Sequence, residues 1–317
     1  MKVSQSPHLH AKDSVSGIML LVFVALIPAA LAGVWIFGFR AALVLMVSMA
    51  SCVLSEFAWQ KLAKKPVTVN DYSALVTGLL LGLNMPATIP LWMVLLGSVF
   101  AIVVVKQLFG GIGQNFMNPA LAARAFLLAS WPEEMTHWAR PFSQLFVRVP
   151  DGISGATPLA ENAPDFLLSD LFLGNIGGCI GEVCKPAILI GAIFLLCKKV
   201  ISPVLPLTYL GTMMVIGTLA GDHPLMVVCS GGVMLGAFFM ATDYVTSPVT
   251  KKGQVIAGLF CGGINCLIRY LGAYPEGCTY AILLMNIVTP LIDRMTAPRV
   301  FGEVGAWQKL CSRKKTK

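Results

Sequence analysis

Long apolar runs that contain almost no charged residues constrain this chain more than any other feature. The clearest runs are Ile18–Phe39, Ala41–Trp59, Leu91–Val105, Ala187–Leu196, Val204–Ala220 and Leu225–Met240. Charged residues make up only 12% of the 317 positions, whereas a soluble domain carries about 25%. Since a bilayer core needs about 20 apolar residues per helix, the sequence predicts an all-α polytopic membrane protein without a large soluble domain.

We expect about ten transmembrane helices in this chain. Their approximate ranges are 17–38, 41–61, 72–85, 90–108, 118–131, 185–201, 203–220, 225–242, 254–271 and 277–295. Prolines fall near the ends of these ranges, where they are tolerated. The first apolar run is too long for the hydrophobic region of a signal peptide, so it is interpreted as a retained first span.

The positions of basic residues predict the orientation. With the N-terminus inside, most of the 23 Lys and Arg residues fall on one side, including Lys64–Lys65, Lys198–Lys199, Lys251–Lys252 and the tail at 296–317. The positive-inside rule then places both termini in the cytoplasm and the link at 132–184 outside. The net charge of +8 is explained by a basic rim beside anionic lipid, so no nucleic-acid partner is expected.

The two halves of the chain resemble each other. Ser73–Pro90 and Gly231–Pro248 are both Gly-spaced apolar stretches that end in polar residues and prolines. Because the first would enter the membrane from inside and the second from outside, we expect two inverted five-helix repeats, at 1–131 and 185–295. Interrupted helices at matching positions of inverted repeats indicate a central site in transporters.

The outer link contains the seven residues Asp151-Gly-Ile-Ser-Gly-Ala-Thr157. A turn in a polar loop is one interpretation of them. They also resemble the flavinylation signature of the family formed by the D subunit of the Rnf electron-transport complex and the B subunit of the sodium-pumping NADH:quinone reductase. The resemblance implies that a flavin transferase attaches FMN to Thr157 by a phosphoester bond. Asp151 would approach the Mg²⁺ of that reaction, while Ser154, Gly155 and Ala156 complete a slim recognition sequence.

The resemblance covers essentially the whole chain. It continues through Phe109–Arg124, Met240–Thr250 and Asn286–Asp293, although Tyr244 stands where the family pattern leads us to expect proline. The length fits the Rnf D subunit better than the longer quinone-reductase subunit. The resemblance implies a urea-transporter-like fold in the bacterial inner membrane. It also implies electron transfer between ferredoxin and NAD⁺ through FMN, coupled to Na⁺ or H⁺ translocation, by a subunit that is not catalytic alone.

The same resemblance implies partners and a second cofactor. The expected partners are a covalent-FMN G-type subunit, an NADH-binding C-type subunit, iron–sulfur subunits and small membrane subunits. A second, non-covalent flavin such as riboflavin is an expected occupant of the helix bundle. No phosphate-binding nucleotide loop is visible, so NADH is not expected to bind this chain. The alternatives are a B-type quinone-reductase subunit, a small-solute channel on the same fold, and a scaffold with a vestigial flavin.

Asn115, Asn118 and Arg124 lie at the start of the fifth expected helix, after a Gly-rich turn. Free N–H groups at a helix N-terminus suit a polar or anionic ligand, and Arg124 could stabilise a reduced, negatively charged flavin ring. The alternative is that Asn118 caps the helix ahead of Pro119 while Arg124 extends outward.

Three carboxylates at or within expected helices are candidates for an ion path: Asp243, Asp293 and Glu56. Intramembrane carboxylates are costly, and this makes them functional candidates. Ion pairing is the alternative, with Lys61 as the partner of Glu56 and Arg294 or Arg299 as the partner of Asp293.

Cysteine and histidine patterns give little sign of a metal site. The nine cysteines form no Cys-x-x-Cys pair, and the spacings Cys179/Cys184 and Cys261/Cys266 match iron–sulfur or zinc patterns poorly. We interpret them as small packing residues, with a cluster ligand shared with another subunit as the alternative. The four histidines are scattered, so no metal site is expected.

Overall fold

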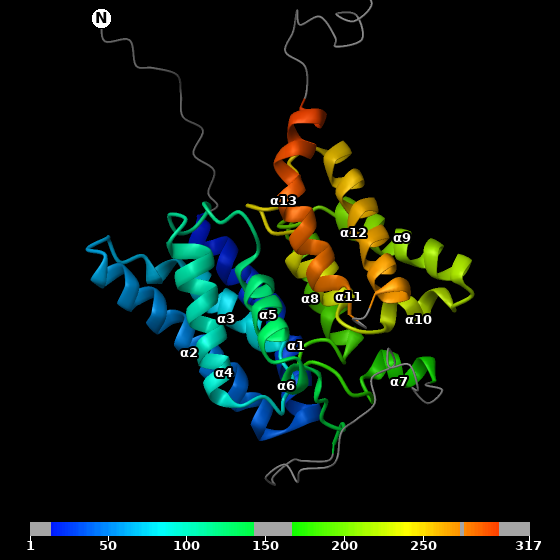
Figure 1. Cartoon of the computed structure of the whole chain (residues 1–317), viewed down its shortest axis with the longest axis horizontal. Coiled ribbons are helices and arrows are strands. Elements are labelled where there is room, and N and C mark those ends of the chain that lie inside the picture. The colour runs from blue at the N-terminus through cyan, green and yellow to red at the C-terminus, as the bar shows by residue number, and fades with distance from the viewer. Residues whose placement is uncertain (1–13, 143–166, 273–275, 298–317) are drawn as a thin grey trace, which may run out of the picture.

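A computed structural model describes residues 14–142, 167–272 and 276–297. These residues form helices and connecting segments without any β-strand, so the all-α class is confirmed. Figure 1 shows the helices of the first half, α1 to α5, grouped on one side and those of the second half, α8 to α13, on the other. The halves meet where α1 contacts α8 and where α5 contacts α13.

The first half consists of helices separated by short links. They are α1 (Val15–Phe37), α2 (Phe39–Leu62), the short η1 (Val69–Asp71), α3 (Ser73–Leu83), α4 (Leu91–Val99), its π-helical continuation η2 (Phe100–Gln107), α5 (Pro119–Ser130) and α6 (Pro132–Thr136). The second half begins with α7 (Leu168–Leu173), α8 (Lys185–Cys197), α9 (Val204–Ala220) and α10 (Pro224–Cys229). It continues with α11 (Val233–Leu235), the π-helical η3 (Gly236–Met240), α12 (Lys251–Leu271) and α13 (Cys278–Thr296).

Three of the described helices, α1, α2 and α12, are long and apolar enough to cross a membrane. Shorter apolar helices include α3, α5, α8 and α9. The 11 residues of α3 extend only about 16 Å at 1.5 Å per residue, which is about half of a bilayer core. The chain therefore has the character of a membrane protein, and the arrangement of ten spans in inverted repeats stays a prediction.

The helix expected at 225–242 is interrupted in its first third. α10 ends at Cys229, and α11 begins only at Val233. Between them, Gly231 adopts a φ of 64°, which glycine tolerates without strain. The Arg269 guanidinium donates hydrogen bonds to the carbonyl of Val227 (2.8 Å) and to the hydroxyl of Ser230 (2.9 Å). A carbonyl at the end of α10 thus finds a partner although the helix stops.

Small residues allow the helices to approach closely. A Cβ atom on Gly78 of α3 would lie 2.7 Å from the Cα of Met49 in α2, and the Ser48 hydroxyl donates to the Gly78 carbonyl at 2.7 Å. Between α12 and α9, a Cβ atom on Gly258 would lie 1.9 Å from the Thr208 hydroxyl oxygen. Such contacts are typical of packed membrane helices.

The described ends of the chain lie on the same side of the bundle. In Figure 1, α1 begins and α13 ends at the upper edge, while α6 and α7, which flank the link at 143–166, lie in the lower part. The flavinylation-like residues Asp151, Ser154, Gly155, Ala156 and Thr157 belong to that link and lie outside the described residues.

Candidate functional site

A pocket opens between α1, α3, the start of α5, the end of α8 and η3. It has an empty volume of about 850 Å³, which includes space open to solvent. Its wall is mainly apolar. The polar and aromatic side chains in the wall are Ser73, Thr77, Lys106, Asn115, Asn118, Thr242, Asp243, Phe238, Phe239 and Tyr244.

Asn118 caps α5, as one of the two interpretations of the sequence expects. Its Oδ1 accepts hydrogen bonds from the backbone N–H groups of Ala120 (3.0 Å) and Leu121 (3.3 Å). Its Nδ2 donates to the Met240 carbonyl at 3.4 Å, so the start of α5 is tied to the end of η3. Asn118 still lines the pocket, so the cap and the pocket wall share one residue.

Asn115 and Asp243 lie in the same wall, on segments far apart in the sequence. The Asn115 amide donates to the Met117 carbonyl at 3.0 Å. Asp243 follows η3, and its Oδ2 accepts from the Thr246 hydroxyl at 3.2 Å. The fold thus brings together a candidate ligand-binding residue and a candidate ion-path residue.

Arg124 is separated from this pocket, although the sequence grouped it with Asn115 and Asn118. It is not in the pocket wall, and at 5% exposure it does not extend outward. Its guanidinium donates to Asn84 Oδ1 (3.2 Å), to the Cys179 sulfur (3.3 Å) and to the Glu276 carboxylate. The outward orientation was wrong because a guanidinium with buried acceptors gains more from them than from the membrane surface.

Glu56 forms an ion pair, but with a different lysine from the expected one. Both carboxylate oxygens accept from Lys106 Nζ at 2.9 Å, and one also accepts from Gln107 Nε2 at 2.7 Å. The pairing with Lys61 was wrong, because residues five apart on a helix do not share a face. Lys61 is exposed and lies over the Phe57 ring instead.

Asp293 lies near the end of α13 and makes no ion pair among the described residues. Its Oδ1 accepts from the backbone N–H of Val249 at 3.1 Å, which ties α13 to the segment after Asp243. Of its two expected partners, Arg294 does not pair with it and Arg299 lies outside the described residues.

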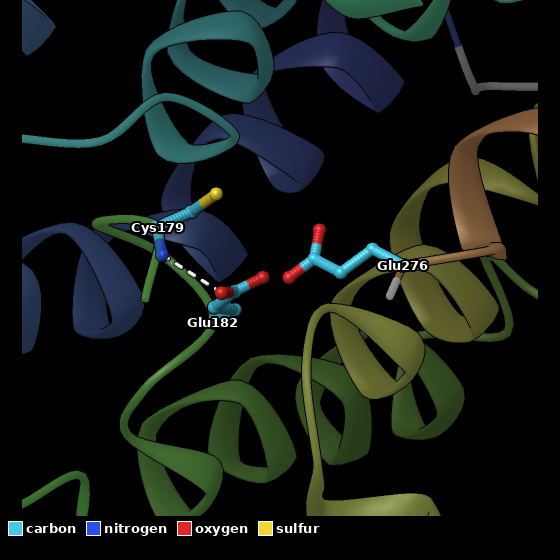
Figure 2. Close-up of side chains that lie close together, drawn as sticks. All are labelled: Cys179, Glu182 and Glu276. Atoms are coloured by element: carbon cyan, nitrogen blue, oxygen red, sulfur yellow. Dashed lines mark hydrogen bonds between the residues drawn. The ribbon is translucent and has the colours of Figure 1, made fainter. Parts of the chain in front are cut away.

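A second buried charge cluster was not anticipated from the sequence. It joins Cys179, Glu182 and Lys185 from the segment between α7 and the start of α8, Arg124 from α5, and Glu276 from the approach to α13. We call these five residues the outer cluster, after the side of the bundle that holds α6 and α7. Figure 2 shows Cys179, Glu182 and Glu276 facing one another. An available signal was the Glu182 and Lys185 pair immediately before an apolar run.

The cysteines of the described residues are unpaired, and most are buried. This agrees with a packing role. Ligand atoms of Cys179, Glu182 and Glu276 lie within 4.8 Å of one another, which is compact enough for a metal ion. However, the Arg124 guanidinium contacts both Cys179 and Glu276, so a cation already occupies this position.

Comparisons with known proteins agree with the resemblance seen in the sequence. A model of the NQR2, RnfD, RnfE family matches residues 2–302. The protein is also similar to the D subunit of the Na(+)-translocating ferredoxin:NAD(+) oxidoreductase complex of Acetobacterium woodii. The two are 50% identical over 311 residues, which cover 95% of each chain.

Two more distant relatives carry related names. The D subunit of the proton-translocating ferredoxin:NAD(+) oxidoreductase complex of Clostridium ljungdahlii is 41% identical over 321 residues, 95% of this chain and 96% of the relative. The D subunit of the ion-translocating oxidoreductase complex of Escherichia coli is 36% identical over 346 residues, 95% of this chain and 98% of the relative. The expected family is confirmed: the chain belongs to the NQR2, RnfD, RnfE family.

Proposed function

We propose that this chain is the D subunit of an Rnf-type complex, a redox-driven ion translocase that moves electrons between ferredoxin and NAD⁺. The observation that carries the proposal is the family match at 2–302, together with relatives named as D subunits that are covered almost end to end. These names favour the Rnf complex over a B-type quinone-reductase subunit. They also favour electron transfer over a passive channel, which has no need of a redox group.

Covalent FMN on Thr157 is the central part of this function. The sequence from Asp151 to Thr157 supports it, and so does the position of the link, whose flanks α6 and α7 lie opposite the start of α1. We place the link outside and both termini in the cytoplasm of a bacterial inner membrane. The bound FMN supplies one- and two-electron redox chemistry; the chain supplies the tether, the orientation and the surroundings.

We also propose the pocket beside Asn118 as the place of a second, non-covalent flavin such as riboflavin. Phe238, Phe239 and Tyr244 offer aromatic surface for a planar ring, while Asn115 and Asp243 offer hydrogen-bonding groups. Arg124 lies outside the pocket wall, so the asparagines, rather than the arginine, would orient this flavin.

For the ion path we propose Asp243 as the first contact and Asp293 as its neighbour. Asp243 lies in the pocket wall, and Asp293 holds the backbone at Val249, six residues further along the chain. The support for Glu56 as part of the ion path is weaker, because its carboxylate is already paired with Lys106. The relatives are named for Na⁺ in one case and for protons in another, so either ion suits the proposal.

The inverted five-helix repeats are part of the same proposal. Two matched contacts support them. Lys106, at the end of η2, donates to the Ser73 hydroxyl (2.6 Å) at the start of α3. Arg269, near the end of α12, donates to the Ser230 hydroxyl (2.9 Å) just before α11. In each half, a cation near the end of one helix thus contacts a serine at the start of the proposed equivalent helix.

The proposed partners are the other subunits of such a complex. They comprise a covalent-FMN G-type subunit, an NADH-binding C-type subunit, iron–sulfur subunits and small membrane subunits. A flavin transferase is needed for maturation.

In-gel flavin fluorescence of the denatured protein tests the covalent FMN. The protein produced with its transferase should fluoresce, and Thr157→Ala should abolish the signal. Thr136→Ala is the matched control, since Thr136 lies in α6 on the same flank and its hydroxyl donates only to local helix carbonyls. Fluorescence that persists in Thr157→Ala, or is lost equally in both variants, would overturn the assignment.

A further inference from the structure

The Glu182 carboxylate in the outer cluster is buried, and no cation of the described residues lies at ion-pairing distance from it. Glu182 is 4% exposed. Its Oε1 accepts from the Cys179 backbone N–H at 2.7 Å, whereas its Oε2 has no hydrogen-bond partner among the described residues. The two ion pairs of the described chain, Lys106–Glu56 and Arg124–Glu276, do not include it.

The nearest basic groups are committed elsewhere. Arg124 uses its two terminal nitrogens for Asn84, Cys179 and Glu276. Lys185, which is fully buried, donates to the backbone carbonyls of Glu182 and of Gly231, the latter at 2.9 Å. Neither cation neutralises the Glu182 side chain directly.

A buried carboxylate in such surroundings must lose its charge or gain a cation, because an isolated charge in a low-dielectric interior is very costly. Arg124 already contacts the other two members of the candidate metal triad, so its positive charge would repel a metal ion there. A proton needs no additional ligands, and therefore it is the cation that this geometry accommodates.

The cluster also contains a complementary pair of unsatisfied atoms. Arg124 Nε and Glu182 Oε2 are both buried and unpaired. Both side chains border Gly232: a Cβ atom there would lie 2.9 Å from Glu182 Oε2 and 3.8 Å from Arg124 Nη1. Glycine thus leaves room for the guanidinium to turn from Glu276 toward Glu182.

We propose that Glu182 is a proton-binding site on the outer side of the bundle, and that Arg124 controls its occupancy by pairing with either Glu276 or Glu182. In the structure Arg124 pairs with Glu276, and in the proposed scheme Glu182 then carries the proton on Oε2. When Arg124 turns to Glu182, the Glu182 proton passes to water, and Glu276, whose side chain is partly exposed, becomes the carboxylate without a partner. The groups facing Glu182 are Arg124, Lys185, Glu276 and the Cys179 thiol, with the Cys278 thiol of α13 behind Gly232.

This inference does not depend on the proposed flavin chemistry, and infrared spectroscopy tests it without turnover. The sample is the full chain in its intact membrane complex, compared in H₂O and D₂O. We expect a carbonyl band of a protonated carboxylic acid that shifts in D₂O and is lost in Glu182→Gln. Glu56→Gln is the matched control and should keep the band, because Glu56 is equally buried but paired with Lys106. An unchanged band in Glu182→Gln would overturn the proposal.

Glu276→Gln provides a second test, which also serves if Glu182→Gln fails to assemble. Removing the charge of Glu276 frees Arg124 for Glu182, so the protonated band should disappear although Glu182 is present. A band of unchanged amplitude in Glu276→Gln would contradict the control by Arg124.

Discussion

The Glu56 carboxylate accepts hydrogen bonds from the Lys106 ammonium at both oxygens and from the Gln107 amide at one, whereas that of Glu182 accepts a single hydrogen bond from a backbone N–H. Both side chains are buried, at 1% and 4% exposure. Glu56 lies with the cytoplasmic ends of α2 and η2 in the proposed orientation, and Glu182 lies on the opposite side.

The different hydrogen-bond partners of Glu56 and Glu182 indicate that burial alone does not make a membrane carboxylate functional. Glu56 has hydrogen-bond partners at both carboxylate oxygens, and its pair with Lys106 joins α2, η2 and the start of α3. We interpret this pair as a structural connection. Glu182 has the burial of Glu56 without its partners, and such a group can exchange a proton at little structural cost.

The largest expected effect comes from breaking the satisfied pair. Lys106→Met leaves the Glu56 carboxylate buried and unpaired, and removing one partner of a buried pair costs about 3–5 kcal/mol. Lys61→Met is the control, since Lys61 is exposed on the same helix as Glu56 and should change the free energy of unfolding only slightly. Unfolding of the purified protein in mixed micelles measures both. An equal decrease in the free energy of unfolding in the two variants would show that the Lys106–Glu56 pair does not stabilise the fold.

A smaller effect should separate the two glutamates directly. Glu56→Gln removes the negative charge but keeps an oxygen that can accept a hydrogen bond from Lys106, so it should lower the free energy of unfolding by about 1–3 kcal/mol. Glu182→Gln replaces a protonated carboxyl group by an amide of the same shape, and should stay within about 0.5 kcal/mol of the parent. Similar decreases in the free energy of unfolding in both variants would contradict the proposed difference between Glu56 and Glu182.

The smallest effect concerns the space beside Glu182. Gly232→Ala places a Cβ atom 2.9 Å from Glu182 Oε2, which forces the carboxyl group to shift and should cost about 1 kcal/mol. Gly263→Ala in α12 meets no atom within 4 Å and should be neutral or stabilising by up to about 1 kcal/mol. The same micelle unfolding assay compares them; a stabilising Gly232→Ala would show that the space is not needed.

The helical membrane character of the fold could be predicted, because apolar runs need no tertiary information. The interruption before α11 was only hinted at by Gly231 and Gly232, since its stability depends on Arg269, which is 39 residues from Ser230. The predicted partner of Glu56 was wrong for a similar reason. The sequence suggested the nearby Lys61, but in the structure Glu56 pairs with Lys106, 50 residues further along the chain.

The outer cluster shows why buried sites formed by distant segments could not be predicted from the sequence. Arg124, Glu182 and Glu276 come from three segments, and Glu276 is 152 residues from Arg124. No periodicity links them. By contrast, the Asp151–Thr157 motif is local, so it could be recognised from the sequence although it lies outside the described residues.

Mass spectrometry of the peptide that contains Thr157 is the sharpest test of the covalent attachment of FMN. The protein should be produced together with its flavin transferase and digested before analysis. We expect a peptide heavier by one FMN less one water, with fragment ions that place the addition on Thr157. An unmodified peptide under these conditions, or an addition on another residue, would rule out covalent FMN on Thr157.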